Sequence, residues 1–119
     1  MFGTSGIRGI ANQEVTAELA LSVGNACGSH CDSIVVGHDP RTSSQMLHNA
    51  FTVGALAAGA SVTDVSLVST PTLAHAAREH HIGAMITASH NPPEYNGIKL
   101  FNPDGTGFST EQSDDIEAS

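Results

Sequence analysis

Three short runs rich in β-branched and small apolar residues recur along this chain, and stretches with helical patterns separate them. The runs are residues 33–37, 62–68 and 84–87. Each run predicts a strand, and strands joined by helices of this length are usually parallel neighbours with right-handed crossovers. The alternation predicts an α/β fold: a three-layer α/β/α sandwich around a mixed, mostly parallel sheet of four strands.

Helix start and stop signals lie around these runs. Residues 16–28 carry an apolar stripe at helical spacing, so a leading helix is expected there. Residues 42–58 begin with Thr-Ser-Ser-Gln, which matches a capping box, and a glycine follows them. Thr70 followed by Pro71 predicts the N-cap and first turn of a third helix, which reaches about His80.

Parallel strands leave a sheet at the same edge, so the loops that follow the three runs are expected to converge. These loops are residues 38–41, 69–71 and 89–92. The crevice outside the carboxyl ends of strands is where open α/β sheets bind ligands. The sequence therefore predicts a ligand-binding edge built from these loops, with Ser89 and His90 presented at a strand end.

The chain turns back after the third loop. Two prolines at 92–93 block a helix, and the Asn-Gly pair at 96–97 is a tight-turn signal. We expect residues 98–101 to return as an antiparallel edge strand. This strand would bring Lys99, the only lysine of the chain, near Ser89.

A glycine-rich opening is a further candidate for anion binding. Residues 2–9 hold three glycines and two hydroxyl side chains, Thr4 and Ser5, around Arg8. This composition suits a bent loop with exposed N–H groups and a guanidinium that pairs with anions. Taken alone, such a segment is more often an ordinary turn, so anion binding is favoured only together with Ser89, His90 and Lys99.

The charge balance excludes several function classes. Twelve acidic residues face four basic ones, for a formal net charge of −8. No run of lysine or arginine is present to bind nucleic-acid phosphates against that charge. No apolar segment approaches the roughly 20 residues that a bilayer crossing needs, and the N-terminus lacks a secretory signal. We therefore expect one cytoplasmic domain that binds neither nucleic acid nor membrane.

The cysteines and most of the histidines are expected to be structural. Cys27 and Cys31 lie four residues apart with His30 between them, which is too few ligands for a structural zinc site. We expect both thiols to be reduced. Four other histidines are expected on helix faces: His48, His75, His80 and His81.

Three motifs follow one another in a characteristic order. They are residues 2–9 (Phe-Gly-Thr-Ser-Gly-Ile-Arg-Gly), residues 87–92 (Thr-Ala-Ser-His-Asn-Pro) and residues 95–99 (Tyr-Asn-Gly-Ile-Lys). Together they closely resemble the α-D-phosphohexomutase superfamily, which includes phosphoglucomutase, phosphomannomutase and phosphoglucosamine mutase. The resemblance implies that residues 1–119 are a single α/β domain, the first and phosphoserine-bearing one of four, with the later domains absent from this sequence.

The resemblance also implies an activity, that of an intramolecular phosphotransferase of the isomerase class. Ser89 would be a phosphoserine that gives its phosphate to a hexose phosphate and regains one from the other end of the sugar. A sugar bisphosphate would be the intermediate and the activator, and one phosphate oxygen of Ser89 would bind Mg²⁺. The hexose stays open between glucose, mannose and glucosamine, because the residues that select the sugar lie in later domains.

Physical chemistry suggests roles for Arg8, His90 and Lys99. Arg8 and Lys99 supply cations that stabilise a transferring phosphoryl group. A lysine beside another cation can have a lowered pKa, so Lys99 is also a candidate general base. His90 is the alternative general base. Hydrogen bonding within the loop would explain the presence of this histidine equally well.

Five further residues are candidates for substrate or phosphate binding. They are Thr4, Ser5, Arg41, Asn91 and Tyr95. For Asn91, fixing the loop is the better explanation. For Arg41, an ion pair with Asp39 explains the side chain at least as well as a phosphate contact does.

The acidic Asp-Gly-Asp loop of the family's metal site has no match in this sequence. The pair at 104–105 (Asp-Gly) is typical of a hairpin turn, while Asp114 and Asp115 fall in a last helix, opened by a capping box at 109–112. We therefore expect these 119 residues alone to be inactive, to need the remaining domains of a parent chain, and to expose apolar surface for self-association.

A function of another class remains as the alternative, a non-catalytic α/β module that binds an anion or a partner. A nucleotide-binding domain is disfavoured, because no Gly-x-Gly-x-x-Gly follows a strand.

Overall fold

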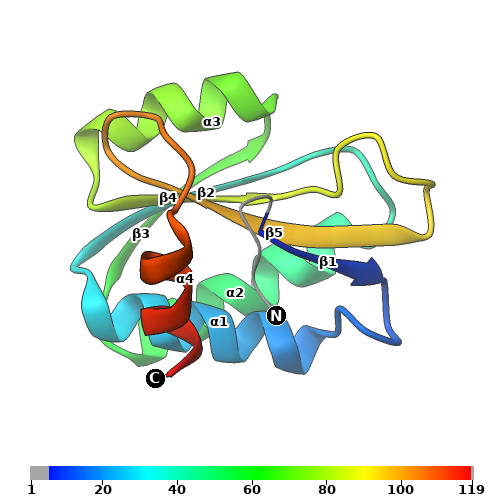
Figure 1. Cartoon of the computed structure of the whole chain (residues 1–119), viewed down its shortest axis with the longest axis horizontal. Coiled ribbons are helices and arrows are strands. Elements are labelled where there is room, and N and C mark those ends of the chain that lie inside the picture. The colour runs from blue at the N-terminus through cyan, green and yellow to red at the C-terminus, as the bar shows by residue number, and fades with distance from the viewer. Residues whose placement is uncertain (1–5, 119) are drawn as a thin grey trace.

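A mixed sheet of five strands forms the centre of residues 6–118, the part that this computed structural model describes (Figure 1). The strands are β1 (Ile7–Ile10), β2 (Ser33–His38), β3 (Ser61–Leu67), β4 (Ile82–Ile86) and β5 (Tyr95–Phe101). Their order across the sheet is β1-β5-β4-β2-β3. β2 runs parallel to β3 and β4, whereas β5 is antiparallel to β4 and β1.

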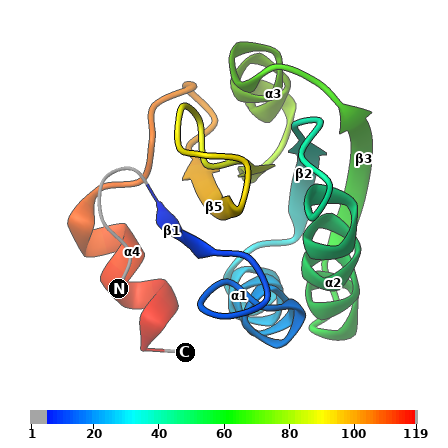
Figure 2. The ribbon, with the colours of Figure 1, turned by 90° about the vertical axis from the view of Figure 1, so that its right-hand side faces the viewer.

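Helices cover both faces of the sheet. They are α1 (Ala17–His30), α2 (Ser44–Ala57), α3 (Thr70–Ala76) and α4 (Thr110–Glu117), with a short 3-10 helix, η1 (Ala77–Glu79), after α3. Figure 2 shows α1 and α2 on one side of the sheet, α3 on the other, and α4 beside β1. The predicted three-layer α/β/α sandwich is therefore confirmed.

Each face of the sheet has its own apolar core. Alternate residues of a strand point to opposite faces, so Val36 of β2 packs toward α1 and α2 while Val35 packs toward α3. Phe51 of α2 is fully buried in the first core, and Leu73 of α3 is fully buried in the second. The central strands are thus buried on both sides, and the loops that leave their carboxyl ends start from fixed points.

The helices α1 and α2 approach each other closely because glycines meet at their contact. A Cβ atom on Gly24 would overlap the carbonyl oxygen of Phe51, and a Cβ on Gly54 would overlap the carbonyl oxygen of Leu21. Neither position has room for a side chain. The close contact anchors α2, whose N-terminus follows the loop that leaves β2.

The three predicted parallel strands are confirmed by β2, β3 and β4. The predicted number of four strands is wrong, because β1, from the glycine-rich opening, pairs antiparallel with β5. β1 takes the edge that the sequence predicts for the returning strand, so β5 lies inside the sheet. The sheet is also evenly mixed, since two of its pairings are parallel and two are antiparallel.

The tight turn predicted at residues 96–97 is wrong, because both residues lie within β5. The chain reverses earlier, at residues 92–95, where an N–H to carbonyl hydrogen bond closes the turn. The side chain of Asn96 is fully buried and donates to the hydroxyls of Ser43 (2.8 Å) and Ser44 (2.9 Å) at the start of α2. This residue therefore joins strand to helix.

Two predicted helix starts are shifted. The N-cap of α2 is Ser43, which makes no side-chain capping hydrogen bond, so the capping box predicted at residues 42–45 does not form. The N-cap of α3 is Ser69 rather than Thr70, and the regular helix gives way to η1 before residue 80. The capping box predicted at residues 109–112 is confirmed.

The hairpin turn predicted at residues 104–105 is confirmed. The N–H of Asn102 donates to the carbonyl oxygen of Thr106 (2.7 Å) across the turn. Gly105 has a φ of 88°, in the left-handed region that favours glycine.

Several polar side chains lie elsewhere than the sequence predicts. His80 and His81 follow η1 and are not on a helix, and their rings hydrogen-bond to Ser33 and Asp32. His48 points inward from α2 and is 1% exposed. Within residues 6–118, no group of three or more His, Cys, Asp or Glu side chains is placed to hold a metal, and no helix is long and apolar enough to cross a membrane.

Both thiols are free in the structure. Cys27 is fully buried in the core beside α2, and burial raises the pKa of its thiol. Cys31, at the end of α1, is half-buried.

Candidate functional site

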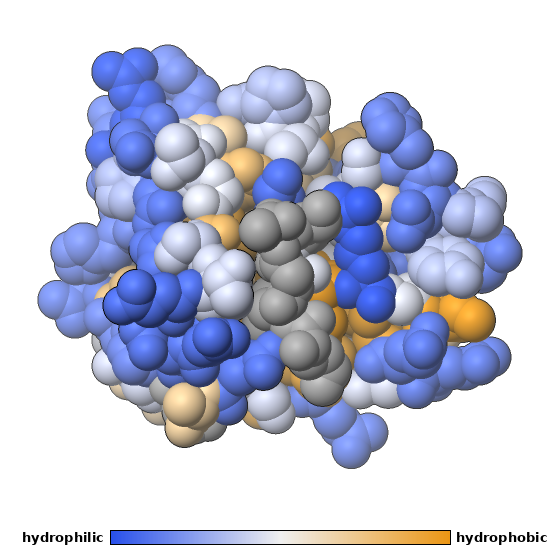
Figure 3. Space-filling model, in the orientation of Figure 1, coloured by the Kyte–Doolittle hydropathy of each residue, from blue (hydrophilic) through white to orange (hydrophobic). Residues whose placement is uncertain are grey.

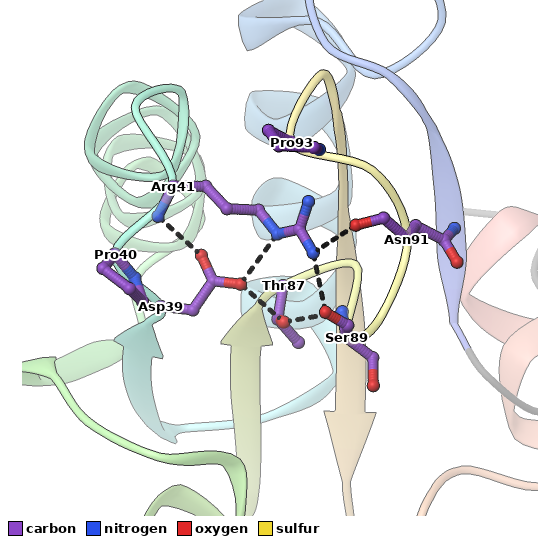
Figure 4. A pocket seen from close by; sticks show the side chains of 7 residues that line it. All are labelled: Asp39, Pro40, Arg41, Thr87, Ser89, Asn91 and Pro93. Carbon is purple, nitrogen blue, oxygen red and sulfur yellow. Dashed lines mark hydrogen bonds and ion pairs between the residues drawn. The ribbon is translucent and has the colours of Figure 1, made fainter.

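Two of the loops that are predicted to converge form a cleft at the carboxyl ends of β2 and β4. The cleft has a volume of about 410 Å³ and is drawn in Figure 4. It is lined by Asp39, Pro40, Arg41, Thr87, Ser89, Asn91 and Pro93. The third loop, residues 69–71, contributes no lining residue.

Ser89 follows β4 and has an unusual backbone conformation. Its φ of 56° lies in the left-handed region, which is uncommon for residues other than glycine. Its N–H donates to the hydroxyl oxygen of Thr87 (2.9 Å), and its carbonyl oxygen accepts from Arg41 (2.6 Å). The side chain is exposed, and Figure 4 shows its hydroxyl directed away from Arg41. The backbone of this serine is therefore held on both sides while its hydroxyl stays accessible.

Asp39 is the centre of the polar contacts in the cleft. Its Oδ1 accepts from the Ser44 hydroxyl (2.6 Å) and the Arg41 backbone N–H (3.1 Å). Its Oδ2 accepts from the Thr87 hydroxyl (2.7 Å) and from Nε of Arg41 (3.1 Å). Burial raises the pKa of the Asp39 carboxyl, but these hydrogen bonds outweigh burial, so the pKa lies below its ordinary value of 3.8. Asp39 is thus a fixed negative charge at neutral pH.

Arg41 joins the two loops that form the cleft. Its guanidinium forms an ion pair with Asp39, and the two side chains are 12% and 16% exposed, respectively. The remaining N–H groups donate to carbonyl oxygens of the loop after β4: Nη1 to Pro92 (2.7 Å) and Tyr95 (3.0 Å), and Nη2 to Ser89 (2.6 Å) and Asn91 (2.9 Å). Of the two explanations that the sequence allows for Arg41, the ion pair is present.

Lys99 and Arg8 lie on the sheet, outside the cleft lining. Lys99 of β5 lies opposite Met85 of β4, and its Nζ is 5.3 Å from the ring centroid of Phe101, a cation–π contact. Arg8 of β1 lies opposite Gly97, so it shares with Lys99 the face of the sheet on which α3 packs. The Nε of Arg8 is buried and has no hydrogen-bond partner among the described residues.

The other candidate residues are distributed around the cleft. His90 is exposed beside Ser89 but is not among the lining residues, whereas Asn91 is. Tyr95 contributes its backbone carbonyl to Arg41. Two candidates, Thr4 and Ser5, lie outside the described residues.

Thr87 is a residue of the cleft to which sequence reasoning assigns no role of its own. Its hydroxyl donates to Asp39 and accepts from the N–H of Ser89, so it links the two loops. The signal that could have found it is its position, because a short polar side chain directly after a buried parallel strand faces the ligand-binding edge.

Comparison with known proteins identifies the relatives of this chain. Residues 1–119 match a protein family that is described as "Phosphoglucomutase/phosphomannomutase, alpha/beta/alpha domain I". The chain is 59% identical to the probable phosphoglucosamine mutase of Methanocella arvoryzae over 98% of this chain and 27% of that protein. It is 46% identical to the phosphoglucosamine mutase of Methanocaldococcus jannaschii over 98% of this chain and 25% of that protein. The chain thus spans about a quarter of the length of these relatives.

Two solved structures share the fold. A putative phosphomannomutase from Thermus thermophilus superimposes with a TM-score of 0.92 at 35% identity, over 99% of this chain and 29% of that one. A phosphoglucomutase/phosphomannomutase family protein from Burkholderia thailandensis superimposes with a TM-score of 0.82 at 30% identity, over 99% of this chain and 30% of that one.

Proposed function

Because this chain belongs to the phosphoglucomutase/phosphomannomutase family, as its α/β/α domain I, we propose that it is the phosphoserine-bearing domain of a longer mutase. That protein would interconvert hexose 1-phosphate and hexose 6-phosphate through a sugar bisphosphate. Ser89 would donate a phosphoryl group to one end of the sugar and recover one from the other end.

The observation that carries this proposal is the presentation of Ser89. A serine hydroxyl is a weak nucleophile, so phosphoryl transfer depends on positioning and on electrostatic stabilisation. The backbone N–H and carbonyl of Ser89 are both hydrogen-bonded, yet its side chain is exposed at the edge where α/β sheets bind ligands. This arrangement suits a group that must meet substrates repeatedly in one orientation.

Glucosamine phosphate is the substrate that we favour. The relatives at 59% and 57% identity are both called probable phosphoglucosamine mutase. Glucose or mannose phosphate is the second candidate. Its support is the two solved structures at 35% and 30% identity, a putative phosphomannomutase and a phosphoglucomutase/phosphomannomutase family protein.

Arg8, Lys99 and His90 would serve the transfer. Arg8 has a buried Nε without a partner among residues 6–118, which suits an incoming phosphate oxygen. Lys99 would add a second cation from the neighbouring strand and is one candidate for the base that takes the sugar hydroxyl proton; exposed His90 is the other. Asn91 and Tyr95 would hold the loop, and Thr4 and Ser5 would contact phosphate.

Mg²⁺ would be bound by a phosphate oxygen on Ser89, and its charge would stabilise the transferring phosphoryl group. The described residues do not complete such a site. Asp39 is the carboxylate that lines the cleft, and both of its oxygens already accept two hydrogen bonds each. The other metal ligands would therefore come from the rest of the longer protein.

Phosphate incorporation tests the proposal. We expect the full-length protein, incubated with glucose 1,6-bisphosphate and Mg²⁺, to carry one phosphate that peptide mapping places on Ser89. Ser89→Ala should carry none, while Ser22→Ala, at an exposed position on α1, should behave as the wild type does. No phosphate on Ser89 in the wild type would contradict the mutase and favour a non-catalytic anion- or partner-binding module.

The sugar is decided by a second measurement on the same protein. Conversion of glucosamine, glucose and mannose 1-phosphates to their 6-phosphates can be followed by phosphorus NMR. We expect the highest kcat/KM for glucosamine 1-phosphate. A higher kcat/KM for glucose or mannose 1-phosphate would make that sugar the favoured substrate instead.

A further inference from the structure

The geometry points to Arg41 as a positioning residue that holds the Ser89 backbone in its reactive orientation, and not as a ligand of the substrate phosphate. This inference rests on the proposed function, because it assigns a role within the same phosphoryl transfer. It concerns a closed set of contacts, which we call the Ser89 clamp: Asp39, Arg41 and Thr87.

The clamp binds both backbone polar groups of Ser89, its carbonyl oxygen and its N–H. On the carbonyl side, Nη2 of Arg41 donates to the Ser89 oxygen at 2.6 Å. On the amide side, the Ser89 N–H donates to Thr87 Oγ1 at 2.9 Å, and the Thr87 hydroxyl in turn donates to Asp39 at 2.7 Å. The ion pair between Asp39 and Arg41 closes the ring. Each backbone polar group of Ser89 is thus tied to the same charged pair.

The backbone conformation of Ser89 explains why a clamp is needed. A φ of 56° is unfavourable for a serine, and such conformations persist where the surrounding structure over-determines them. Without the clamp, the loop would relax toward commoner conformations. The direction of the Ser89 side chain would then change, since the position of Oγ follows from the backbone of its own residue.

Arg41 itself has no donor left for a substrate. A guanidinium has five N–H donors, and those of Arg41 reach one carboxylate oxygen and four carbonyl oxygens. Its charge is balanced by Asp39, and its side chain is 12% exposed. A phosphate could bind it only by displacing contacts that shape the loop. Arg8 differs, because its buried Nε has no hydrogen-bond partner among the described residues and so remains a donor for a substrate.

The shape of the guanidinium is also specific to this task. Its planar fork reaches Asp39 on one loop and four carbonyl oxygens on the other, whereas a lysine ammonium is a single point with three donors. Arg41→Lys keeps the charge and removes the fork. The matched control is Arg78→Lys, because Arg78 is exposed on η1, away from the cleft lining.

The test uses the full-length protein that contains this segment. We expect Arg41→Lys to reduce kcat and the rate of Ser89 phosphorylation by about 100-fold, the size of loss that a small misplacement of a reacting group produces. The KM for the sugar phosphate should change by less than about 3-fold, because Arg41 does not touch it. Arg78→Lys should leave both constants unchanged. A KM raised by about 10-fold or more with kcat preserved would overturn the inference and make Arg41 a substrate ligand.

Thr87 provides a second test that keeps the proposal falsifiable if Arg41→Lys fails to fold. Thr87→Val removes the hydroxyl at nearly constant volume, and Thr87→Ser retains it. We expect the Val variant to lose kcat with little change in KM, and the Ser variant to recover most of that loss. Equal kcat in the two variants would show that the hydroxyl link to Ser89 does not matter.

Hydrogen exchange separates failure of the clamp from failure of the proposed function. We expect the Ser89 amide to exchange faster in Thr87→Val than in the wild type, with the core amides of β4 unchanged. If the wild type takes up no phosphate, the proposed function fails, and the exchange rates alone decide whether the clamp holds the loop. Unchanged exchange at Ser89 would overturn the clamp, whatever the activity.

Discussion

Ser89 and Asp39 differ in which of their polar groups are bound within the protein. Ser89 has its backbone polar groups bound and its side chain exposed, whereas Asp39 has its carboxylate bound by four donors within the protein. A lowered pKa keeps Asp39 ionised, so its charge can hold Arg41 and Thr87 throughout the neutral range. The carboxylate of Asp39 is thus bound within the protein, whereas the side chain of Ser89 stays exposed.

His48 is another residue whose environment has a measurable consequence. Its Nδ1 lies 2.8 Å from Nδ1 of His38, with the two rings in edge-to-face contact, and its Nε2 lies 3.1 Å from Oδ1 of Asp64. Burial lowers the pKa of His48, the charge of His38 lowers it further, and together they outweigh the opposing effect of Asp64. His48 is therefore neutral in the folded protein at neutral pH, and it gains a proton more readily after unfolding.

This difference predicts how stability depends on pH. A base with a lowered pKa in the folded state binds more protons when unfolded, so its contribution is fully present above the ordinary value of 6.5 and is lost as the pH falls toward the lowered value. We expect the free energy of unfolding of this chain, measured in urea, to fall between about pH 7 and pH 5. His48→Gln should flatten this fall, and His75→Gln, at an exposed position on α3, should not. Identical slopes in the wild type and His48→Gln would argue against the assignment.

At the scale of elements, the contact between α1 and α2 shows how small residues control the site at a distance. Leu47 and Phe51 of α2 are fully buried on the sheet, while Gly54 of the same helix lies against the backbone of α1. The first turn of α2 carries Ser44, which hydrogen-bonds to Asp39. The packing of this helix therefore sets the position of one donor to the Ser89 clamp.

Figure 3 shows the hydrophilic residues gathered over much of the face viewed in Figure 1, with smaller apolar areas between them.

Gly54→Ala tests the close contact. Alanine is a better helix former than glycine by about 1 kcal/mol, which alone would stabilise α2. The added Cβ would overlap the carbonyl oxygen of Leu21, and overpacking of this kind typically destabilises by about 1–3 kcal/mol. We expect a net loss in the free energy of unfolding and a lower melting temperature by calorimetry. Leu56→Ala, at an exposed position on the same helix, should have a much smaller effect, and a Gly54→Ala chain as stable as the wild type would show that α1 and α2 can separate without loss.

At the scale of the whole molecule, the proposed function makes the described residues one side of a larger site. The cleft is open, and the carboxylate that lines it, Asp39, already accepts four hydrogen bonds within the protein. Arg8 and Lys99 lie on the neighbouring part of the sheet, as cations that could face a substrate held from another side. The relatives are about four times longer than this chain, which covers 25–27% of their length.

We predict that the 119-residue chain alone does not isomerise hexose phosphates. With a single wall and no complete set of metal ligands among residues 6–118, it can neither enclose the sugar nor stabilise the transferring group. The measurement is phosphorus NMR of glucosamine 1-phosphate with glucose 1,6-bisphosphate and Mg²⁺, in parallel with the full-length protein. Formation of the 6-phosphate by the short chain at a rate near that of the full-length protein would contradict the prediction.

The layer architecture, the three parallel strands and the place of Ser89 at a strand end could all be predicted from the amino-acid sequence. These features depend on hydrophobic periodicity and on local turn chemistry, which are properties of short segments. The capping box of α4 was also predicted, whereas the same local pattern at residues 42–45 does not form a capping box. Contacts between distant segments place β1 at the sheet edge and Asn96 within a strand, and neither feature was predicted. The same is true of the five donors of Arg41, which converge on two loops about fifty residues apart. Pairings of this kind are set by contacts between distant segments, and no local pattern encodes which segments meet.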